Sequence, residues 1–360
     1  MATATASSAT AASLSTRAAI METACSSVGG RITDGTHVKK KRDSIGELQV
    51  GDCIGEGTHG CVFRAVSSAS GHVAVKRMRK TSGGISITAY REMALLREMP
   101  AHPNVVRLIG ALAEPPMFSL VFEYGGTCLA NMVNERQDTG FAPGIVGTLM
   151  RQLLSGLDHL HGLGVMHRDI KPANLLVQSE GPDLRLRIGD FGLARLAHNP
   201  LRPLDLDGPV QSPWYRAPEL LLGSRTYTTQ VDLWSAGCIL GECLILRPLF
   251  VGEELQDEAL QQDQLTQLFL TLGLPSADSW PELPTLRHWP AVQKWPSADF
   301  VDRLQERILA EVPERSSVPS AEILALLRGL LTYSPEARLT ARSAYLYLLC
   351  GETDFPTRPS

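Results

Sequence analysis

One octapeptide, HRDIKPAN at 167–174, places a carboxylate, an ammonium group and an amide close together. Asp169 can accept a proton from a hydroxyl nucleophile, and the amide of Asn174 can hold a metal ion. Lys171 can balance the negative charge of a transferred group. Asp190, in a DFG triplet after a predicted strand, adds an oxygen ligand of the kind that Mg²⁺ prefers. The combination indicates metal-assisted phosphoryl transfer.

A glycine-rich segment and a lysine supply groups that could hold phosphates. The segment has the spacing GxGxxGxV, formed by Gly55, Gly57, Gly60 and Val62. It continues into a predicted strand, whereas the similar dinucleotide-binding fingerprint opens a helix. Lys76, in an apolar strand, needs an anion, and Glu92 in the following predicted helix is its natural partner. Taken singly, the two features also suit an ordinary hairpin and a solvated lysine, and their pairing favours phosphate binding.

The order of predicted elements gives an α+β fold with two lobes. Alternating apolar residues from Leu48 predict a β-meander, followed by a helix at 86–99 and further strands up to Glu123. After Gly126 the apolar residues recur at helical spacing. We therefore expect a β-rich N-lobe, a mainly helical C-lobe, and a ligand cleft between them. The predicted domains are a tail at 1–45, a catalytic domain at 46–348 divided into 46–124 and 125–348, and a short tail at 349–360.

The first 45 residues are rich in Ala, Ser and Thr and lack apolar periodicity, so they are predicted to be disordered. An organelle transit peptide is an alternative that fits the same composition but is less favoured. The run KKKR at 39–42 suits either a nuclear-import patch or a solvated charge run. We expect a cytoplasmic protein, with nuclear or ciliary and flagellar locations as further options.

Composition also limits the partners. The net charge of −4 with interspersed signs predicts no nucleic-acid partner. The longest apolar stretch, 233–246, is shorter than the roughly 20 residues that a spanning helix needs, so we predict a buried helix and no membrane insertion. The seven cysteines show no CxxC or Cys/His ligand spacing and are interpreted as reduced intracellular thiols.

In order and spacing, these motifs resemble those of the eukaryotic protein kinase family, and Ala217-Pro218-Glu219 completes the set. The resemblance covers about residues 48–348 and implies a bilobal kinase fold with ATP in the cleft and Mg²⁺ as cofactor. The implied catalytic residues are Lys76, Glu92, Asp169, Lys171 and Asn174. The implied metal ligands are Asn174 and Asp190. Glu219 is expected to pair with Arg338 and brace the helical lobe.

The same resemblance implies an adenine pocket in which the backbone of residues 123–125 forms the hinge, behind Phe122 as the bulky gatekeeper. The predicted nucleotide-binding residues are Ile54, Gly55, Glu56, Gly57, Gly60, Val62, Ala74, Lys76, Phe122, Glu123, Tyr124, Gly125, Leu176 and Asp190. An internal apolar column anchored on Asp232 is expected from Leu96, Leu108, His167 and Phe191.

Lys171-Pro172 after the catalytic aspartate is similar to Ser/Thr kinases. The segment 214–216 and the helix at 86–92 resemble the cyclin-dependent group, and GEGTHG, KPANLL and SWPEL resemble its cell-cycle-related branch, tied to cilia and flagella. The group implies protein substrates with Ser/Thr followed by Pro, and a cyclin or cyclin-like activator on helix 86–99. Tyr90 departs from the aliphatic residue usual in that helix, so packing on the small lobe alone is an open alternative.

The activation segment also departs from the group. Asp207 stands where relatives carry a phosphorylated threonine, while the three arginines that receive the phosphate are present as Arg91, Arg168 and Arg195. We hypothesise that Asp207 docks on these arginines as a partial mimic, since a carboxylate carries less charge than a phosphate. A solvated loop acid is the alternative. Ser212 takes the place of a threonine that hydrogen-bonds Asp169 and Lys171.

Two other functions are compatible with parts of this pattern. A pseudokinase or scaffold would keep the fold and work by binding, but it would normally lack one of the lysine, base or metal residues, all of which are present. A small-molecule kinase would not need the segment 214–219, which resembles a peptide-binding platform. The sequence therefore favours an active Ser/Thr protein kinase.

Overall fold

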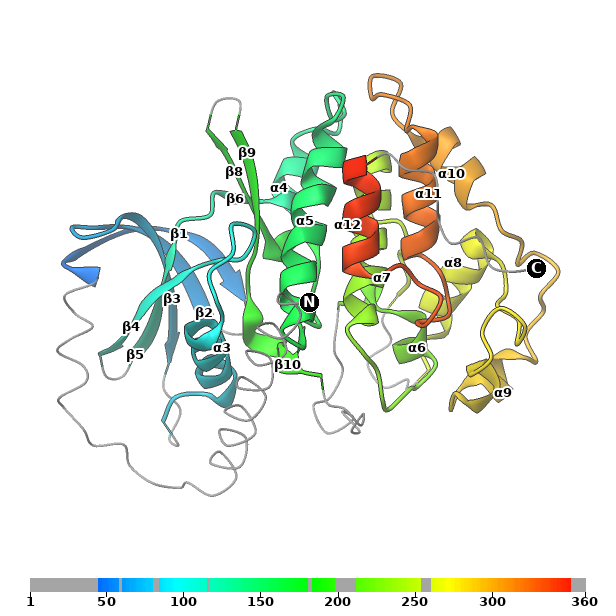
Figure 1. Ribbon diagram of the computed structural model, residues 1–360, viewed down its shortest axis with the longest axis horizontal. Coiled ribbons are helices and arrows are strands. Elements are labelled where there is room, and N and C mark those ends of the chain that lie inside the picture. The colour runs from blue at the N-terminus through cyan, green and yellow to red at the C-terminus, as the bar shows by residue number, and fades with distance from the viewer. Residues whose placement is uncertain are drawn as a thin grey trace, which may run out of the picture.

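The computed structural model describes residues 45–57, 60–79, 84–114, 117–180, 183–197, 212–253 and 260–350. Within them the chain forms a β-rich lobe and a helical lobe side by side, as predicted (Figure 1). The predictions for the N-terminal tail and for Asp207 fall outside the described residues.

The small lobe is built on a five-stranded antiparallel sheet in the order β1-β2-β3-β5-β4. Its strands are β1 (Leu48–Gly57), β2 (Gly60–Ser67), β3 (Gly71–Arg79), β4 (Leu108–Glu114) and β5 (Met117–Glu123). Successive side chains of a strand point to opposite faces of the sheet, and here both faces carry apolar residues. Val73, Val75 and Val121 pack with Ile45 in a small outer core, whereas Ala74 and its neighbours on the other face belong to the main core.

One helix, α3 (Ile87–Glu98), packs beside this sheet (Figure 1). Ser86 begins it, because its side chain accepts a hydrogen bond from the amide of Ala89 and so satisfies one open donor of the first turn. The helix predicted at 86–99 is therefore confirmed, with its two end residues serving as caps.

The large lobe is mainly helical. Its helices are α4 (Leu129–Asn134), α5 (Ile145–Gly162), α6 (Pro218–Leu221), α7 (Gln230–Ile245), α8 (Gln262–Leu272), α9 (Trp289–Val292), α10 (Leu304–Glu311), α11 (Ala321–Leu330) and α12 (Ala341–Cys350). Three further strands, β6 (Thr127–Cys128), β8 (Leu175–Glu180) and β9 (Asp183–Ile188), form one small sheet, and β7 (Val165–Met166) pairs with β10 (Arg195–Leu196). Single turns of 3-10 helix occur at Pro172–Asn174, Phe191–Leu193, Pro213–Tyr215 and Leu283–Thr285.

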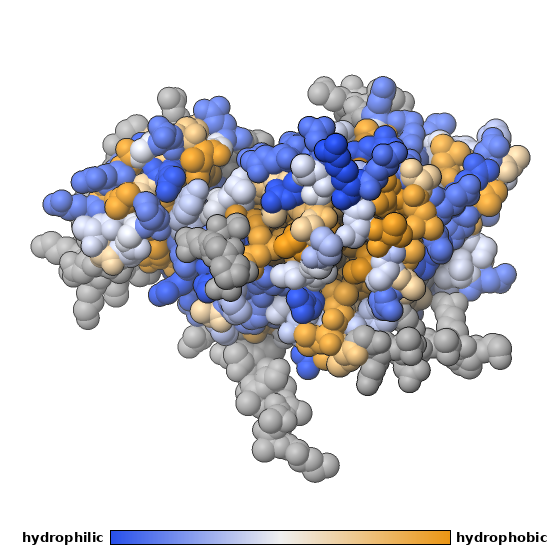
Figure 2. All heavy atoms as spheres, turned by 90° about the horizontal axis from the view of Figure 1, so that it is seen from above, coloured by the Kyte–Doolittle hydropathy of each residue, from blue (hydrophilic) through white to orange (hydrophobic). Residues whose placement is uncertain are grey.

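Helix α7 forms the centre of the large lobe, and every residue from Val231 to Ile245 is buried. The prediction of a buried helix at 233–246 is confirmed, although Leu246 itself ends the helix in a left-handed conformation. Among the described residues, no helix combines the length and apolar character needed to cross a bilayer. Hydrophilic and hydrophobic residues are interspersed on the face seen in Figure 2.

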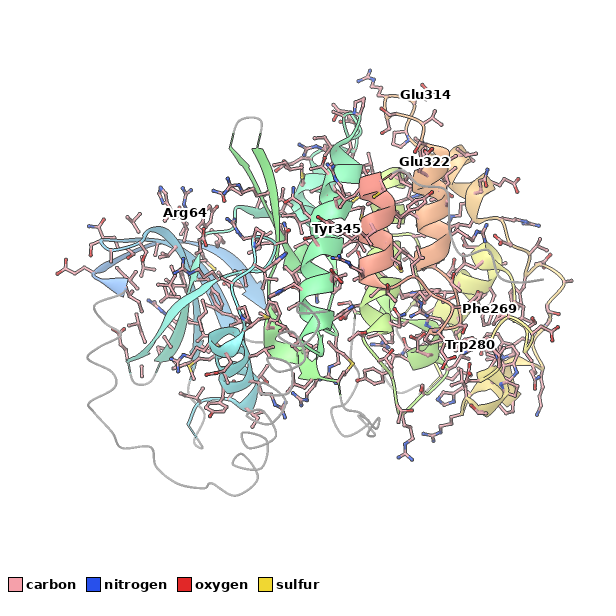
Figure 3. All side chains as sticks on the ribbon, viewed as in Figure 1. Arg64, Phe269, Trp280, Glu314, Glu322 and Tyr345 are labelled. Atoms are coloured by element: carbon pink, nitrogen blue, oxygen red, sulfur yellow. The ribbon has the colours of Figure 1, made fainter. Side chains whose placement is uncertain are left out.

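An aromatic cluster packs around Tyr333 in this core, and one of its rings comes from α7 itself. The rings of Trp234, Phe269 and Trp280 have their centres 6.0–6.3 Å from the centre of the Tyr333 ring, and the two labelled in Figure 3 lie in the large lobe. The Tyr333 hydroxyl donates to the carbonyl of Gly273 at 2.8 Å, so the one polar atom of this side chain is satisfied.

A buried ion pair ties α6 to the chain before α12. The guanidinium of Arg338 forms two hydrogen bonds with the carboxylate of Glu219, each 2.9 Å long, and lies 5.2 Å from the centre of the Trp234 ring. Arg338 also donates to backbone carbonyls, among them that of Thr332. The predicted pair is therefore confirmed, and its bidentate geometry is the strong form of this interaction.

Replacing Glu219 by Ala is expected to leave the Arg338 charge buried and unpaired, and to lower the free energy of unfolding by about 3–5 kcal/mol. Arg342→Ala provides the matched control, because it removes an exposed ion pair with Asp158 and should cost less than about 1 kcal/mol. Urea unfolding followed by tryptophan fluorescence measures both. Equal unfolding midpoints for the two variants would contradict the bracing role.

Candidate active site

Lys76, on β3, contacts side chains from two other parts of the chain. Its ammonium nitrogen lies 2.8 Å from a carboxylate oxygen of Glu92, on α3, and 2.8 Å from a carboxylate oxygen of Asp190. Burial alone would lower the pKa of Lys76, but the two carboxylates outweigh it and raise the pKa. Lys76 therefore stays positively charged, as a phosphate-binding lysine must.

A second set of contacts gathers around Asp169. Lys171 Nζ lies 2.9 Å from Asp169 Oδ2 and donates to Ser212 Oγ at 3.0 Å. Ser212 Oγ in turn donates to Asp169 Oδ1 at 3.3 Å. This triangle ties the start of the described segment at 212–253 to the predicted base, and Ser212 makes both of the contacts that were predicted for its hydroxyl.

Asn174 is oriented by the same aspartate. Its amide nitrogen donates to Asp169 Oδ2 at 2.9 Å and to the Asp169 carbonyl at 2.8 Å. Because the nitrogen is used in this way, the amide oxygen is the atom that can bind a metal ion. Asp190, the second predicted ligand, sits in a left-handed conformation with φ of 57° and accepts from the amide of Gly192. Hard oxygen ligands of this kind fit Mg²⁺.

The backbone that carries Asp169 is fixed by a buried carboxylate. Asp232, on α7, accepts from the amides of His167 and Arg168 at 2.9 and 2.8 Å, and its Oδ2 lies 3.0 Å from His161 Nε2. Burial by itself would raise the pKa of Asp232, but the hydrogen bonds and the histidines outweigh it and lower the pKa. Arg168 is held at a positive φ of 67°, so the strained turn before the base depends on this anchor.

The predicted apolar column begins on this anchor. The His167 ring packs edge-on against Phe191 with ring centres 4.9 Å apart, and its Nε2 lies 2.9 Å from the Gly189 carbonyl. Leu96 and Leu108 belong to the same main core. The base, the DFG segment and the small lobe thus share one packed interior.

The residues predicted to hold adenine line the junction of the lobes. Ala74 pairs with Phe122 across β3 and β5, and Leu176 packs so closely on Gly125 that a Cβ there would lie 2.6 Å from Leu176 Cδ1. Val62 is partly buried against the main core.

The hinge side chains point to partners outside the pocket. Arg64, labelled in Figure 3, stacks over the Tyr124 ring at 5.1 Å, and Arg187 contacts the Glu123 carboxylate at 3.4 Å. The Glu123 amide donates to the Arg107 carbonyl at 3.0 Å, so it is not available to a ligand. Pairing of the other hinge backbone groups with adenine stays a prediction.

The rest of the predicted nucleotide loop belongs to the β1–β2 hairpin. Gly55 pairs with Val62, Glu56 with Cys61, and Gly57 with Gly60. Ile54 is 46% exposed, so this hairpin leaves an apolar side chain uncovered by protein.

Arg168, one of the three activation-segment arginines, contacts two distant parts of the chain. Arg168 is buried, and it donates to the Leu193 carbonyl at 2.8 Å and to the Tyr227 hydroxyl at 2.9 Å. Sequence reasoning missed Tyr227, which lies 59 residues away in the chain and in no recognised motif. Contacts of Arg91, Arg168 and Arg195 with Asp207 stay a prediction, since Asp207 is outside the described residues.

The geometry of these groups agrees with a comparison to known families. The model of the protein kinase domain matches residues 48–347. The chain belongs to the protein kinase family. The matched region includes Lys76, the predicted base Asp169, and the predicted metal ligands Asn174 and Asp190.

Similar proteins indicate which group of protein kinases the chain resembles. The chain is 39% identical to the serine/threonine-protein kinase SSN3 of Phaeosphaeria nodorum, over 81% of this chain and 72% of the relative. It is 37% identical to a protein named "Probable cyclin-dependent kinase 8" from Dictyostelium discoideum, over 81% and 77%. Among solved structures it is similar to the yeast RNA Pol II CTD kinase CTDK-1 complex, with a TM-score of 0.70, 29% identity, and coverage of 82% of this chain and 91% of that one.

These relatives make the protein a Ser/Thr kinase of the cyclin-dependent type. The resemblance to the ciliary, cell-cycle-related branch is a wrong assignment, because the relatives carry SSN3 and cyclin-dependent kinase 8 names. The short segments behind it, such as KPANLL, lie mostly in catalytic motifs and so discriminate poorly between branches.

Ser212→Ala is expected to lower kcat/KM about tenfold, because a lost hydrogen bond to charged partners is worth about 1.5 kcal/mol. Ser212→Thr keeps the hydroxyl and should retain most of the activity. Steady-state assays with a peptide substrate compare the two variants. A Thr variant as slow as the Ala variant would show that the hydroxyl is not what matters at this position.

Proposed function

We propose that this kinase transfers the γ-phosphate of ATP to Ser or Thr hydroxyls that precede proline, in association with a cyclin-like activator. The observation that carries the chemistry is a series of contacts that links the two groups of charged residues. Lys76 contacts Asp190, and the amide of the adjacent Gly189 donates to the Asn174 carbonyl at 2.8 Å. Asn174 in turn donates to Asp169. The relatives' names support the cyclin-dependent type.

In this proposal Asp169 accepts the proton of the substrate hydroxyl as its oxygen attacks the γ-phosphorus. Lys171 balances the charge on the transferred group, and Ser212 keeps both side chains in place. Lys76 contacts the α- and β-phosphates while Glu92 holds its ammonium. Asn174 and Asp190 would hold Mg²⁺, which supplies positive charge to the phosphate oxygens when bound.

The rival functions lack support. A pseudokinase is not supported, since the relatives are named as Ser/Thr kinases and all five catalytic residues are present. A kinase for small molecules is likewise at odds with these relatives. A cytoplasmic or nuclear location stays a proposal.

Proline direction has one structural support beyond the resemblance. Trp214, two residues after the Ser212 that contacts the base, is 38% exposed, and its indole donates to the Gly252 carbonyl at 3.1 Å, which fixes the ring. Arg216, two residues later, is buried. A rigid, partly apolar platform of this kind suits the residue after the phosphoacceptor.

Asp169→Asn tests the chemistry. A general base contributes about 10²–10⁴-fold, so phosphorylation of a Ser-Pro peptide library with Mg-ATP should fall by that factor while nucleotide binding persists. Asp278→Asn, at an exposed position, serves as the matched control and should be unchanged. If Asp169→Asn phosphorylates the library as fast as the wild type, the assignment of the base is refuted.

The activator is proposed to dock on the start of α3. Ile85 is 37% exposed and Ile87 is 47% exposed there, although both are large apolar side chains. A partner bound at this patch could act on the Lys76 ion pair, because Glu92 lies on the same helix as Ile87. The patch supports a partner over packing on the small lobe alone.

Ile87→Lys should abolish stimulation by a recombinant cyclin that activates the wild type, with basal activity measured in parallel. Val318→Lys, which changes an isolated residue that is 76% exposed, is the control. A panel of purified cyclins identifies the activator first. If no cyclin stimulates the kinase, or if Ile87→Lys responds fully, the docking proposal fails.

A further inference from the structure

Three possible metal ligands meet on the glycine-rich hairpin. The sulfur atoms of Cys53 and Cys61 and a carboxylate oxygen of Glu56 all lie within 4.8 Å of one another. Cys53 and Glu56 are exposed, and Cys61 is half-buried. Sequence reasoning missed this cluster, because neither cysteine belongs to a CxxC or Cys/His pattern.

The cluster depends on an irregularity of β1. Glu56 pairs with Cys61, so their side chains share a face of the hairpin. In a regular strand Cys53, three residues before Glu56, would point to the opposite face. The register shift between Cys53 and Gly55 adds one residue to β1, and Cys53 then pairs with Phe63, which lies on the Cys61 face. The bulge is therefore what brings the two thiols together.

This face is the outer one. Cys61 shares it with Ala65, which packs in the small outer core, whereas the neighbouring Val62 points to the other face. Val62 pairs with Lys76, so the face of Val62 is the one turned to the predicted nucleotide. The Glu56 side chain, on the face of Cys61, therefore points away from the predicted nucleotide, contrary to its place among the residues expected to bind ATP. A ligand on the outer cluster would not compete with ATP for space.

The donor set selects a particular kind of ion. Two thiols and one carboxylate are ligands for Zn²⁺, with bond lengths of about 2.3 Å to sulfur and about 2.0–2.2 Å to oxygen. In a tetrahedral site such bonds separate the ligand atoms by less than about 4 Å, so only small movements are needed. Thiolates disfavour Mg²⁺, which prefers oxygen ligands.

We propose that Cys53, Glu56 and Cys61 form a binding site for Zn²⁺ or a similar thiophilic divalent cation, with water as the fourth ligand. On binding, the two S–H bonds break, two S–metal bonds form, and two protons pass to the solvent without any change of oxidation state. The loaded site carries a net charge of −1, from two thiolates, one carboxylate and the ion.

One positively charged side chain lies on the same face of the hairpin. Arg77 pairs with Cys61 across β2 and β3, and its guanidinium lies 5.1 Å from the centre of the Phe63 ring, on the same face. The Cys53 thiol also contacts the Glu56 carboxylate at 4.0 Å and donates to the Gly55 carbonyl at 3.4 Å, so two of the ligands already touch. Nearby positive charge stabilises an anionic metal site.

A bound ion would clamp the hairpin on either side of its turn. Cys53 and Glu56 lie on β1 and Cys61 lies on β2, so the ion links the two strands of the loop that covers the phosphates in the proposed function. The site itself is independent of the proposed kinase chemistry, since binding can be measured without ATP or substrate.

Binding of Co²⁺ tests the proposal, because thiolate ligands give an intense charge-transfer absorption with this ion. The full chain, freed of metal and reduced with a phosphine, should bind one Co²⁺ with that band, and Zn²⁺ should displace it. Cys53→Ser and Cys61→Ser should each weaken binding at least tenfold and lose the band. Cys350→Ser, which removes an exposed cysteine elsewhere, should bind like the wild type.

A second measurement needs no variant. Alkylation of the wild-type chain, followed by mass spectrometry, should show that Zn²⁺ protects Cys53 and Cys61 but leaves Cys350 reactive. Wild-type binding by both serine variants, or no protection by Zn²⁺, would overturn the site. So would recovery of Cys53 and Cys61 as a disulfide that the phosphine does not reduce.

Discussion

The active site depends first on one buried ammonium group. Lys76 comes from β3, Glu92 from α3 and Asp190 from the loop after β9, so three elements that lie apart in the chain meet at a single positive charge. A lysine in that position without its partners would be too costly to bury. Any movement of α3 away from the sheet would break the contact between Lys76 and Glu92, and Lys76 would keep only the Asp190 carboxylate as its partner.

A second constraint acts from the other lobe. Asp232 is fully buried on the central helix α7 and accepts hydrogen bonds from the backbone amides of His167 and Arg168. These bonds attach the segment that carries the base to the core of the large lobe. Arg338 and Glu219 brace the same lobe through a second buried contact. The small lobe therefore supplies the Lys76 charge and its Glu92 partner, while the large lobe anchors the backbone that carries the base.

Much of this arrangement could be predicted from the sequence. Helix α7 and strands β1 to β3 have strong apolar patterns, and Lys76, Asp169 and Asp190 stand in motifs whose spacing is set by their chemistry.

Features that depend on contacts between distant segments were not predictable in the same way. Tyr227 on Arg168 is one example, because nothing in its neighbours marks it. The cysteine cluster is the clearest miss, since it depends on strand register, which a hydropathy pattern does not reveal. Short motifs near the catalytic loop had the opposite weakness, because they identified the family firmly but carried too little independent information to choose a branch within it.

The irregular register of β1 has a further consequence for the behaviour of the molecule in concentrated solution. β1 is an edge strand, and an edge with regularly spaced open amides and carbonyls invites pairing with strands of other molecules. Two register shifts interrupt that spacing along β1, and a third interrupts β4 at the opposite edge. Both borders of the sheet are thereby poor templates for intermolecular strand addition, which protects the small lobe from aggregation.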